Sequence, residues 1–288
     1  IKLNKKLYDF SSSKFIHLQW LYKKKMNEFL SEAVGTFILI LFGIGVNAGS
    51  NLSKSFSNKE SNSWAMGTFG WGMAVTLGVY AAGQFSDAHI NPAVTLGLLS
   101  SGEIEFYTAI VYIFGQTVGA FSGCLIIYLH YLPLWPDNDS DKVLGIFATS
   151  PSKPSKWSNL LSEIIGTFIL LFGLKFIGIN EFADGLNPIV VGFLVCAIGL
   201  SLGGTTGYAI NPVRDFIPRL SHFILPIPGK GSSNWSYAWI PVIGPIIGGV
   251  MGVSTFNFLF DNILSIYFVV SLSFFIIISI LSFIENKN

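Results

Sequence analysis

The chain has 288 residues, of which 51% are hydrophobic and only 11% are charged. A soluble domain usually carries about a quarter charged residues, so this composition excludes an ordinary soluble protein and predicts an all-α membrane protein. The net charge of +1 is uninformative by itself, but its distribution along the chain is not.

The N-terminal region is strongly basic. It holds seven of the 17 basic residues, namely Lys2, Lys5, Lys6, Lys14, Lys23, Lys24 and Lys25. A basic cluster directly before an apolar span marks the cytoplasmic side of a membrane. The alternative, a nucleic-acid-binding arm, is opposed by the span that follows at once. We therefore predict a cytoplasmic arm over residues 1–27 and no nucleic-acid partner.

Six apolar segments approach the length of about 20 residues that a membrane-spanning helix needs. They lie at residues 28–48, 64–83, 106–130, 158–178, 188–206 and 238–260. The connections at 50–63, 132–156 and 228–234 are polar, and with a cytoplasmic N-terminus all three fall outside, including 131–157 as an extracellular connecting loop. The sequons at Asn51, Asn138 and Asn234 lie in or beside these connections.

Internal repetition divides the chain into a first repeat, 28–130, and a second repeat, 158–260. The stretch "SEAVGTFILILFG" (31–43) returns as "SEIIGTFILLFG" (162–173), so that Glu32 corresponds to Glu163. Each repeat contains three full spans and one half-span, so the second repeat must begin on the opposite side of the membrane. This is an inverted repeat, a design that places sites at the midplane between the two halves.

Glycines recur at every fourth position in "GQTVGAFSG" (115–123) and again in "GPIIGGVMG" (244–252). Small residues at this spacing allow helix backbones to approach closely in lipid. We predict that both ladders serve helix packing.

Two Asn-Pro pairs, Asn91-Pro92 and Asn211-Pro212, each precede an apolar run that is too short to cross a bilayer. Asn is a favoured N-cap and Pro suits the first helical position, so each pair predicts a helix start. About ten helical residues rise about 15 Å, half of a hydrocarbon core of about 30 Å. We expect two half-helices that enter from opposite faces and meet at their N-termini.

That arrangement has an electrostatic consequence. Each helix N-terminus acts like about half a positive charge, so two facing N-termini repel cations, including hydronium. The amides of Asn91 and Asn211 can donate hydrogen bonds to a passing oxygen and interrupt a proton wire.

On these motifs the chain resembles the major intrinsic protein family, the aquaporins and aquaglyceroporins, over roughly residues 28–260. The paired Asn-Pro boxes, Arg214 after the second box, and Glu32 and Glu163 carry the resemblance. It implies six transmembrane helices plus two re-entrant half-helices, with pore-region boxes formed by Asn91, Pro92, Ala93, Asn211, Pro212 and Val213. Val213 departs from the Ala that the family usually has there, and we expect a modest local change in packing.

The resemblance also implies a selectivity filter, carried over by spacing from the boxes, of Trp71, Gly199, Tyr208 and Arg214. This set is similar to the glycerol-conducting branch, as are Asp215 and Arg219, although that branch more often has Phe in place of Tyr208. Gly199 leaves room for a carbon chain, the two aromatic rings offer an apolar corner, and Arg214 presents fixed donors. Taken singly, Trp71 also fits an interfacial belt residue and Arg214 a snorkelling charge.

Glu32 and Glu163 are ionisable groups inside spans, which suggests either a proton relay or structural support of the backbone that leads into the half-helices. The resemblance favours structural support, with His89 bracing the first re-entrant loop and Asp215 beside the second. We expect no enzyme activity, no cofactor and no metal site.

Three functions compete: a passive channel for glycerol, water and other small neutral solutes such as urea, a water-selective channel, and a coupled secondary transporter. Gly199 and Trp71 argue against water selectivity, and only Glu32 and Glu163 offer a coupling-ion site. The resemblance implies a homotetramer embedded in membrane lipid, with the plasma membrane as the expected location. The hydrophobic extension 261–288 contains an uncharged stretch, 263–283, which fits either a seventh span or an interfacial or lipid-facing helix.

Overall fold

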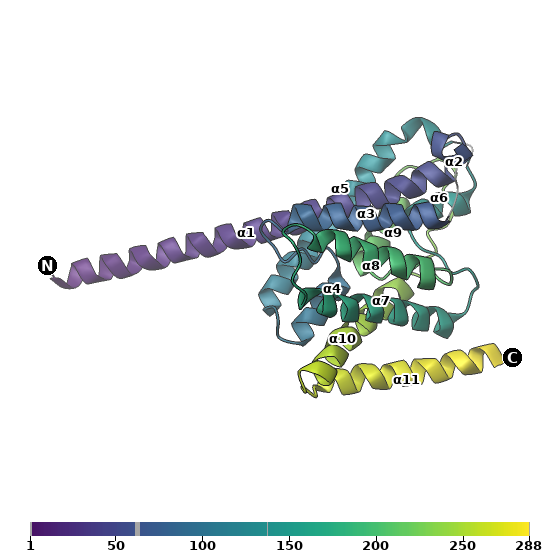
Figure 1. The fold of residues 1–288 in the computed structure, drawn as a ribbon. Coiled ribbons are helices and arrows are strands. Elements are labelled where there is room, and N and C mark those ends of the chain that lie inside the picture. Colours follow the sequence, from purple (N-terminus) through teal and green to yellow (C-terminus); the bar gives the residue numbers. More distant parts are fainter. Residues whose placement is uncertain (1, 61–63, 137, 288) are drawn as a thin grey trace.

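The computed structural model describes the backbone of residues 2–60, 64–136 and 138–287, and within these ranges it is built from helices without strands (Figure 1). Side chains at positions 2–18, 20, 59 and 60 lie outside the described set, and so do the predicted basic groups of Lys2, Lys5, Lys6 and Lys14. The helices in chain order are α1 (Lys2–Asn51), α2 (Phe56–Glu60), α3 (Trp64–Ala82), α4 (Pro92–Ser100), α5 (Phe106–His130), the short 3-10 helix η1 (Leu132–Leu134), α6 (Ser140–Phe147), α7 (Lys156–Gly178), α8 (Asn187–Leu202), α9 (Pro212–Ile224), α10 (Ile240–Phe260) and α11 (Ile266–Lys287).

Most predicted spans coincide with helices. The segments 64–83, 106–130, 158–178 and 238–260 agree with α3, α5, α7 and α10 to within two residues. Among the described residues, five segments are long and apolar enough to cross a membrane, and they are Leu21–Asn51, Phe106–His130, Lys156–Gly178, Ile240–Phe260 and Ile266–Lys287. The chain is thus a helical membrane protein, as predicted.

Two predicted spans differ in extent from the helices that contain them. The segment predicted at 28–48 belongs to α1, which begins at Lys2 and has no break at the predicted arm boundary, because the chain has neither Gly nor Pro before Gly35. The segment predicted at 188–206 ends at Leu202, since Gly203 opens a turn in which the Gly207 N–H donates to the Gly203 carbonyl at 2.9 Å. α8 is accordingly 16 residues long.

The two repeats are held together internally by their glycine ladders, which confirms the packing prediction. A side chain at Gly115 or Gly119 would collide with the backbone carbonyls of Phe29 and Ala33 on α1. On α10, a side chain at Gly248 would collide in the same way with the Ile164 carbonyl on α7. The absence of a side chain lets α5 lie directly against α1, and α10 against α7.

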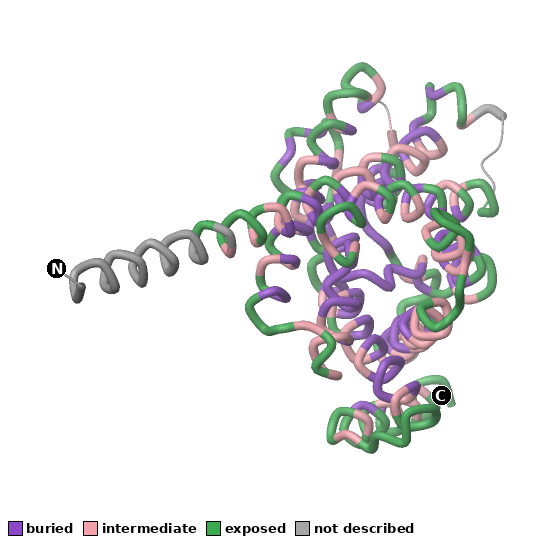
Figure 2. Tube along the Cα trace, turned by 60° about the vertical axis from the view of Figure 1, so that its left-hand side comes forward, coloured by how far each residue is buried: buried purple, intermediate pink, exposed green. Residues whose placement is uncertain are grey.

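The half-helices join the two repeats. α4, from the first repeat, packs mainly against α10, and α9, from the second, packs against α5 as well as α10. α3 and α8 also lie against each other across the boundary between repeats. The buried residues therefore gather at the centre of the bundle, where both half-helices begin (Figure 2).

The connection between the repeats, 131–157, is more than the polar loop that was expected. It contains α6, whose Val143, Ile146 and Phe147 are fully buried, and Trp135, which is 1% exposed. Trp135 and Phe147 stack with their ring centroids 5.8 Å apart. The polar residues around them obscured this apolar anchor, which fixes the connection onto the bundle.

Candidate functional site

The two Asn-Pro pairs begin α4 and α9, as the capping pattern predicted. The side-chain oxygen of Asn91 accepts a hydrogen bond from the Ala93 N–H at 2.8 Å. The oxygen of Asn211 accepts from the N–H groups of Val213 and Arg214 at 3.1 and 3.3 Å. Each amide side chain is therefore fixed by its own helix, with its nitrogen directed away from the cap.

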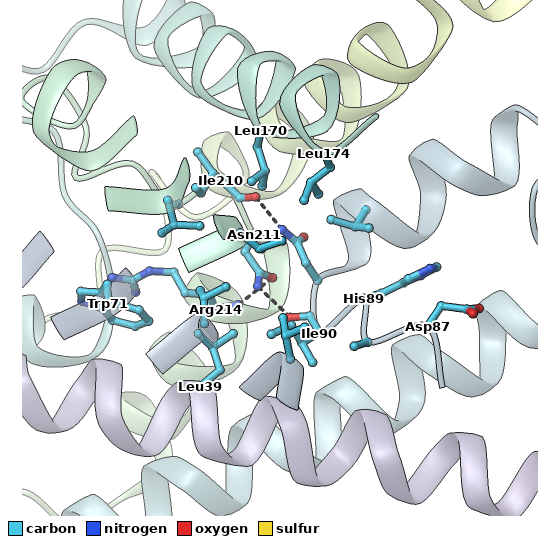
Figure 3. A pocket seen from close by; sticks show the side chains of 18 of the residues that line it. Leu39, Trp71, Asp87, His89, Ile90, Leu170, Leu174, Ile210, Asn211 and Arg214 are labelled. Carbon is cyan, nitrogen blue, oxygen red and sulfur yellow. Dashed lines mark hydrogen bonds between the residues drawn. The ribbon is translucent and has the colours of Figure 1, made fainter. Parts of the chain in front are cut away.

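The same two residues connect the half-helices reciprocally (Figure 3). The Asn91 Nδ2 donates to the Ile210 carbonyl, and the Asn211 Nδ2 donates to the Ile90 carbonyl, each at 2.9 Å. An amide nitrogen carries two hydrogens, so each Asn keeps one donor for another acceptor. Both side chains line the central cavity described below.

The backbone before each half-helix is strained in the same way in both repeats. Ile90 and Ile210 adopt φ values of +43° and +42°, a left-handed conformation that β-branched residues rarely tolerate. Such strain persists only where surrounding contacts impose it. Here it turns the carbonyls of both isoleucines toward the opposite asparagine.

Glu32 and Glu163 make those contacts. The Glu32 carboxylate accepts hydrogen bonds from the backbone N–H groups of His89 and Ile90, at 2.9 and 2.8 Å. The Glu163 carboxylate accepts from the N–H groups of Ala209 and Ile210, at 3.0 and 2.9 Å. Both carboxylates are buried, and each one satisfies two adjacent donors that the strained backbone directs away from the pore.

The surroundings of the two glutamates differ. Glu32 also accepts hydrogen bonds from Ser86 Oγ and from Gln116 Nε2, both at 2.8 Å. At the position of Gln116 the second repeat has Pro245, which cannot donate. Gln116 was not identified from the sequence. Its signal there is a polar residue beside Gly115 in an apolar glycine ladder, where a buried amide needs a hydrogen-bond partner.

A cavity of about 260 Å³ lies where the half-helices meet (Figure 3). Its apolar lining includes Leu39 on one side and Leu170 and Leu174 on the other, and its polar lining includes Asn91 and Asn211. His89 lines this central cavity as well: its Nδ1 lies 3.0 Å from Thr95 Oγ1, and its Nε2 has no hydrogen-bond partner among the described residues. The histidine is also held by Glu32, which accepts from its backbone N–H at 2.9 Å.

Of the six predicted box residues, only Asn91 and Asn211 line the central cavity. The other four, Pro92, Ala93, Pro212 and Val213, are buried in the surrounding packing. Val213 belongs to an apolar cluster with Ala120 and Cys124. Its extra volume relative to Ala is therefore taken up by the helix interface.

The central cavity is continuous in its lining with hollows on both sides. A second cavity of about 480 Å³, which we call the Arg214-side cavity, shares three lining residues with the central cavity, namely Trp71, Tyr208 and Arg214. Its lining also includes Thr149. At the other end, Asp87 is shared with an Asp87-side hollow of about 430 Å³. The three hollows follow one another through the bundle, and Trp71, Tyr208 and Arg214 stand between two of them.

This constriction combines a cation with aromatic rings. The Arg214 guanidinium carbon lies 3.9 Å from the ring centroid of Trp71, and its Nη1 donates to the Phe147 carbonyl at 3.4 Å. The Trp71 indole N–H donates to Asn47 Oδ1 at 3.1 Å. Asn47 and Phe147 were not identified from the sequence. Asn47 gives only a weak signal there, as a polar residue in an otherwise apolar span.

Gly199 lies beside the constriction without lining the hollows on either side of it. A Cβ at this position would lie 2.7 Å from Cζ of Tyr208, so the tyrosine ring occupies the space that the glycine leaves. The Gly199 carbonyl accepts a hydrogen bond from the Trp64 indole at 2.9 Å, and Trp64 in turn contacts the Tyr208 ring edge to face. The room predicted at Gly199 is therefore used to seat the Tyr208 ring.

A buried ion pair fixes the helix that carries Arg214. Arg219 contacts Asp215 through Nε and Nη2, at 2.9 and 2.8 Å, and both side chains are fully buried. Asp215 also accepts from the N–H and the hydroxyl of Thr149, each at 2.7 Å. The second Asn-Pro box is thereby joined to the connection between the repeats, close to the carbonyl that Arg214 contacts.

Comparison with known proteins identifies relatives of this chain. Residues 19–256 match the family model described as major intrinsic protein. The chain is 52% identical over 248 residues to the glycerol uptake facilitator protein of Bacillus subtilis, covering 85% of this chain and 90% of that protein. It is 54% identical over 236 residues to the probable glycerol uptake facilitator protein of Thermotoga maritima, covering 82% of this chain and all of that one.

A solved structure agrees with these sequence relatives. The X-ray structure of the aquaglyceroporin from Plasmodium falciparum matches with a TM-score of 0.71 at 29% identity, covering 82% of this chain and 97% of that one. Sequence and fold lead to the same assignment: the chain belongs to the major intrinsic protein family.

Proposed function

We propose that this chain is a passive membrane channel for glycerol and other small neutral solutes, urea among them, and that it also conducts water. The observation that carries the proposal is the constriction, where Arg214 lies against Trp71 and Tyr208 completes the lining. Glycerol has one edge of hydroxyl groups and one of carbon, which matches this division. Relatives named as glycerol uptake facilitators support the same substrate.

The polar edge would act through hydrogen-bond replacement. A guanidinium has five N–H donors in a fixed fork, and the Phe147 carbonyl accepts from one nitrogen of Arg214 at 3.4 Å. A polyol that enters the constriction loses its hydrogen bonds to water. The remaining guanidinium donors and the second amide hydrogens of Asn91 and Asn211 replace those hydrogen bonds. Apolar side chains of the lining, such as Leu170 and Leu174, accept the carbon edge.

Exclusion of protons and ions follows from the same parts. The N-termini of α4 and α9 face each other at the reciprocal Asn91 and Asn211 contacts, and helix N-termini carry partial positive charge. Arg214 adds a full positive charge at the constriction. Half-helix dipoles exclude protons in aquaporins, and we assign them that role in this chain.

The roles of the remaining site residues are structural. We assign Glu32, Glu163 and His89 to support of the strained loops, because both carboxylates are engaged by backbone N–H groups. Asp215 positions the start of α9 through Arg219 and Thr149. With these roles assigned, we propose a channel rather than an enzyme.

In the cell we propose a homotetramer in the lipid of the plasma membrane, with a cytoplasmic N-terminus. The basic residues that precede the first span support this orientation. It places the Arg214-side cavity and the segment 131–157 outside, and it leaves no role for a nucleic-acid partner.

Stopped-flow measurements on proteoliposomes test the proposal against its two rivals. Glycerol influx should be rapid and should rise nearly in proportion to the glycerol concentration, as in a pore. The rate should not change when a Na⁺ or proton gradient is imposed. A water-selective channel would show water flux without glycerol flux. Gradient-driven accumulation of glycerol that Glu163→Ala abolishes would instead establish a coupled transporter.

A further inference from the structure

The last helix, α11, lies beyond the segment 19–256 that matches the family model. It has 22 residues and exposes most of its large apolar side chains, while only Ser271 and Ile278 are buried. In Figure 2 the helix is coloured almost throughout as exposed or intermediate. A continuous apolar surface of this size is not stable in water and requires an apolar environment.

The start of α11 is fixed to the end of α10. The rings of Phe258 and Phe268 stack with centroids 4.7 Å apart. The turn between the helices is closed by the Ile263 N–H, which donates to the Asn257 carbonyl at 3.0 Å, and Ser265 Oγ accepts from the Phe268 N–H at 3.2 Å. α11 therefore begins at the same level of the bundle at which α10 ends.

The far end of α11 is fixed to the beginning of α7 by Glu285. Its carboxylate accepts hydrogen bonds from the backbone N–H groups of Lys156 and Trp157, at 2.7 and 2.9 Å, and from the Ser155 hydroxyl at 2.7 Å. Ser155, the N-cap residue of α7, makes no capping bond of its own. Glu285 thus supplies the cap of α7 from another helix and places a carboxylate where the helix dipole favours it.

Two further contacts secure this end. Asn286 Nδ2 donates to Ser158 Oγ at 2.6 Å, and the hydroxyls of Ser158 and Ser282 lie 2.8 Å apart. Because the start of α11 is joined to the end of α10 and its end to the start of α7, the helix runs antiparallel to both. Figure 1 shows α11 as a separate rod that leaves the end of α10 and lies outside the bundle.

The beginning of α7 belongs to the Arg214 side of the pore. Thr149 and Ser150, just before α7, line the Arg214-side cavity, and the Ser152 N–H donates to the Thr205 carbonyl at 2.9 Å. α7 and α10 both end on the other side, where the rings of Phe176 and Phe260 are 5.1 Å apart. α11 consequently returns from the Asp87 side to the Arg214 side.

We propose that α11 is a seventh transmembrane helix, fixed by Glu285 to the start of α7, with its outer face in contact with lipid acyl chains. Its 22 residues rise about 33 Å, enough to cross a hydrocarbon core of about 30 Å. An interfacial helix needs a charged or strongly polar face, but α11 has no charged residue before Glu285. Lys287 therefore lies on the Arg214 side of the membrane.

Cysteine labelling with a membrane-impermeant maleimide on sealed membranes tests this topology without relying on transport activity. Lys287→Cys should react from the same side as Lys142→Cys on α6, and from the opposite side to Glu181→Cys between α7 and α8. The native Cys124 and Cys196 are buried, and both are replaced by Ser in the parent variant. Reaction of Lys287→Cys from the Glu181 side would overturn the proposal.

The contact of Glu285 is tested separately by thermal unfolding of the purified full-length protein in detergent. Glu285→Ala should lower the unfolding temperature by about 2–4 °C, as expected for loss of a helix cap. Glu105→Ala is the matched control, because Glu105 stands at the N-cap of α5 without a side-chain capping bond. Equal effects of the two substitutions would show that Glu285 does not hold α11 against α7.

Discussion

Arg214 and Trp71 form one unit between the central cavity and the Arg214-side cavity, with the guanidinium carbon 3.9 Å from the indole centroid. The planar cation is held between an aromatic face and the Phe147 carbonyl, so its remaining donors have a fixed direction. The polar and apolar halves of the constriction are therefore not independent, and a change in either residue should alter the position of the other.

Arg214→Lys should retain the positive charge while losing both the planar stack and the fork of donors. Loss of one hydrogen bond to a charged group costs about 1.5 kcal/mol, so we expect glycerol permeability to fall about tenfold. Cation exclusion should persist because the charge remains. Stopped-flow glycerol flux and electrical conductance measure the two effects, and glycerol flux at the wild-type level would show that the fork is not needed.

Asn47 positions Trp71 and, through its Nδ2, contacts the Ile146 carbonyl of α6 at 3.2 Å. Asn47→Ala should release the indole and reduce the ratio of glycerol to water permeability several-fold, while the helices stay packed. Asn180→Ala is the control, because Asn180 lies just past the end of α7 and its Nδ2 donates to the nearby Phe176 carbonyl, away from Trp71. A change in stability with an unchanged permeability ratio would assign Asn47 a purely structural role.

The capping chemistry explains why the half-helices were predictable. Asn at the N-cap followed by Pro specifies a helix start from local interactions alone, and the glycine ladders carry their packing partners in their spacing. Repetition then located Glu32 and Glu163 without any knowledge of their contacts. These features depend on residues close in sequence or on correspondence between the two repeats.

Features without a repeat partner were missed. Phe147 and Arg214 are 67 positions apart, and the contact of Asn47 with Trp71 depends on how α1 and α3 cross. The apolar anchor of α6 was hidden by polar neighbours. At Gly199 the sequence indicated free space but not its occupant, because the rotamer of Tyr208 is decided by packing against Trp64.

Asp215→Asn should be strongly destabilising, because Arg219 is fully buried and would lose its counter-charge. Breaking a buried pair by removal of one partner costs about 3–5 kcal/mol, although the other carbonyl partners of Arg219 reduce that loss. Asp139→Asn is the control, since Asp139 and Lys142 form an exposed pair that contributes little. Thermal unfolding in detergent compares them, and similar midpoints for the two variants would contradict the prediction.

Gly199→Ala should reduce glycerol permeability more than water permeability. The added Cβ would lie 2.5 Å from Cγ2 of Thr68 and 2.7 Å from Cζ of Tyr208, so both side chains must move, and we expect the tyrosine ring to shift toward the pore that it lines. Overpacking of this kind costs about 1–3 kcal/mol and narrows the constriction for the larger solute. Gly204→Ala is the control, because a Cβ there meets open space. Parallel stopped-flow traces for glycerol and water measure the ratio of the two permeabilities. An unchanged ratio would contradict the prediction and would mean that Trp64 moves outward to make room for the ring.

Tyr208→Phe should leave transport nearly intact. The Tyr208 hydroxyl is buried and has no hydrogen-bond partner among the described residues, whereas the ring itself lines the constriction. Removal of an unsatisfied hydroxyl from a buried site is neutral or stabilising, so glycerol and water permeabilities should stay within about twofold of the wild type and thermal stability should not fall. Tyr208→Ala, which also removes the ring, should change the permeability ratio. If Tyr208→Phe alone lowers glycerol flux, the hydroxyl must turn toward the pore during conduction and donate to the solute beside Arg214.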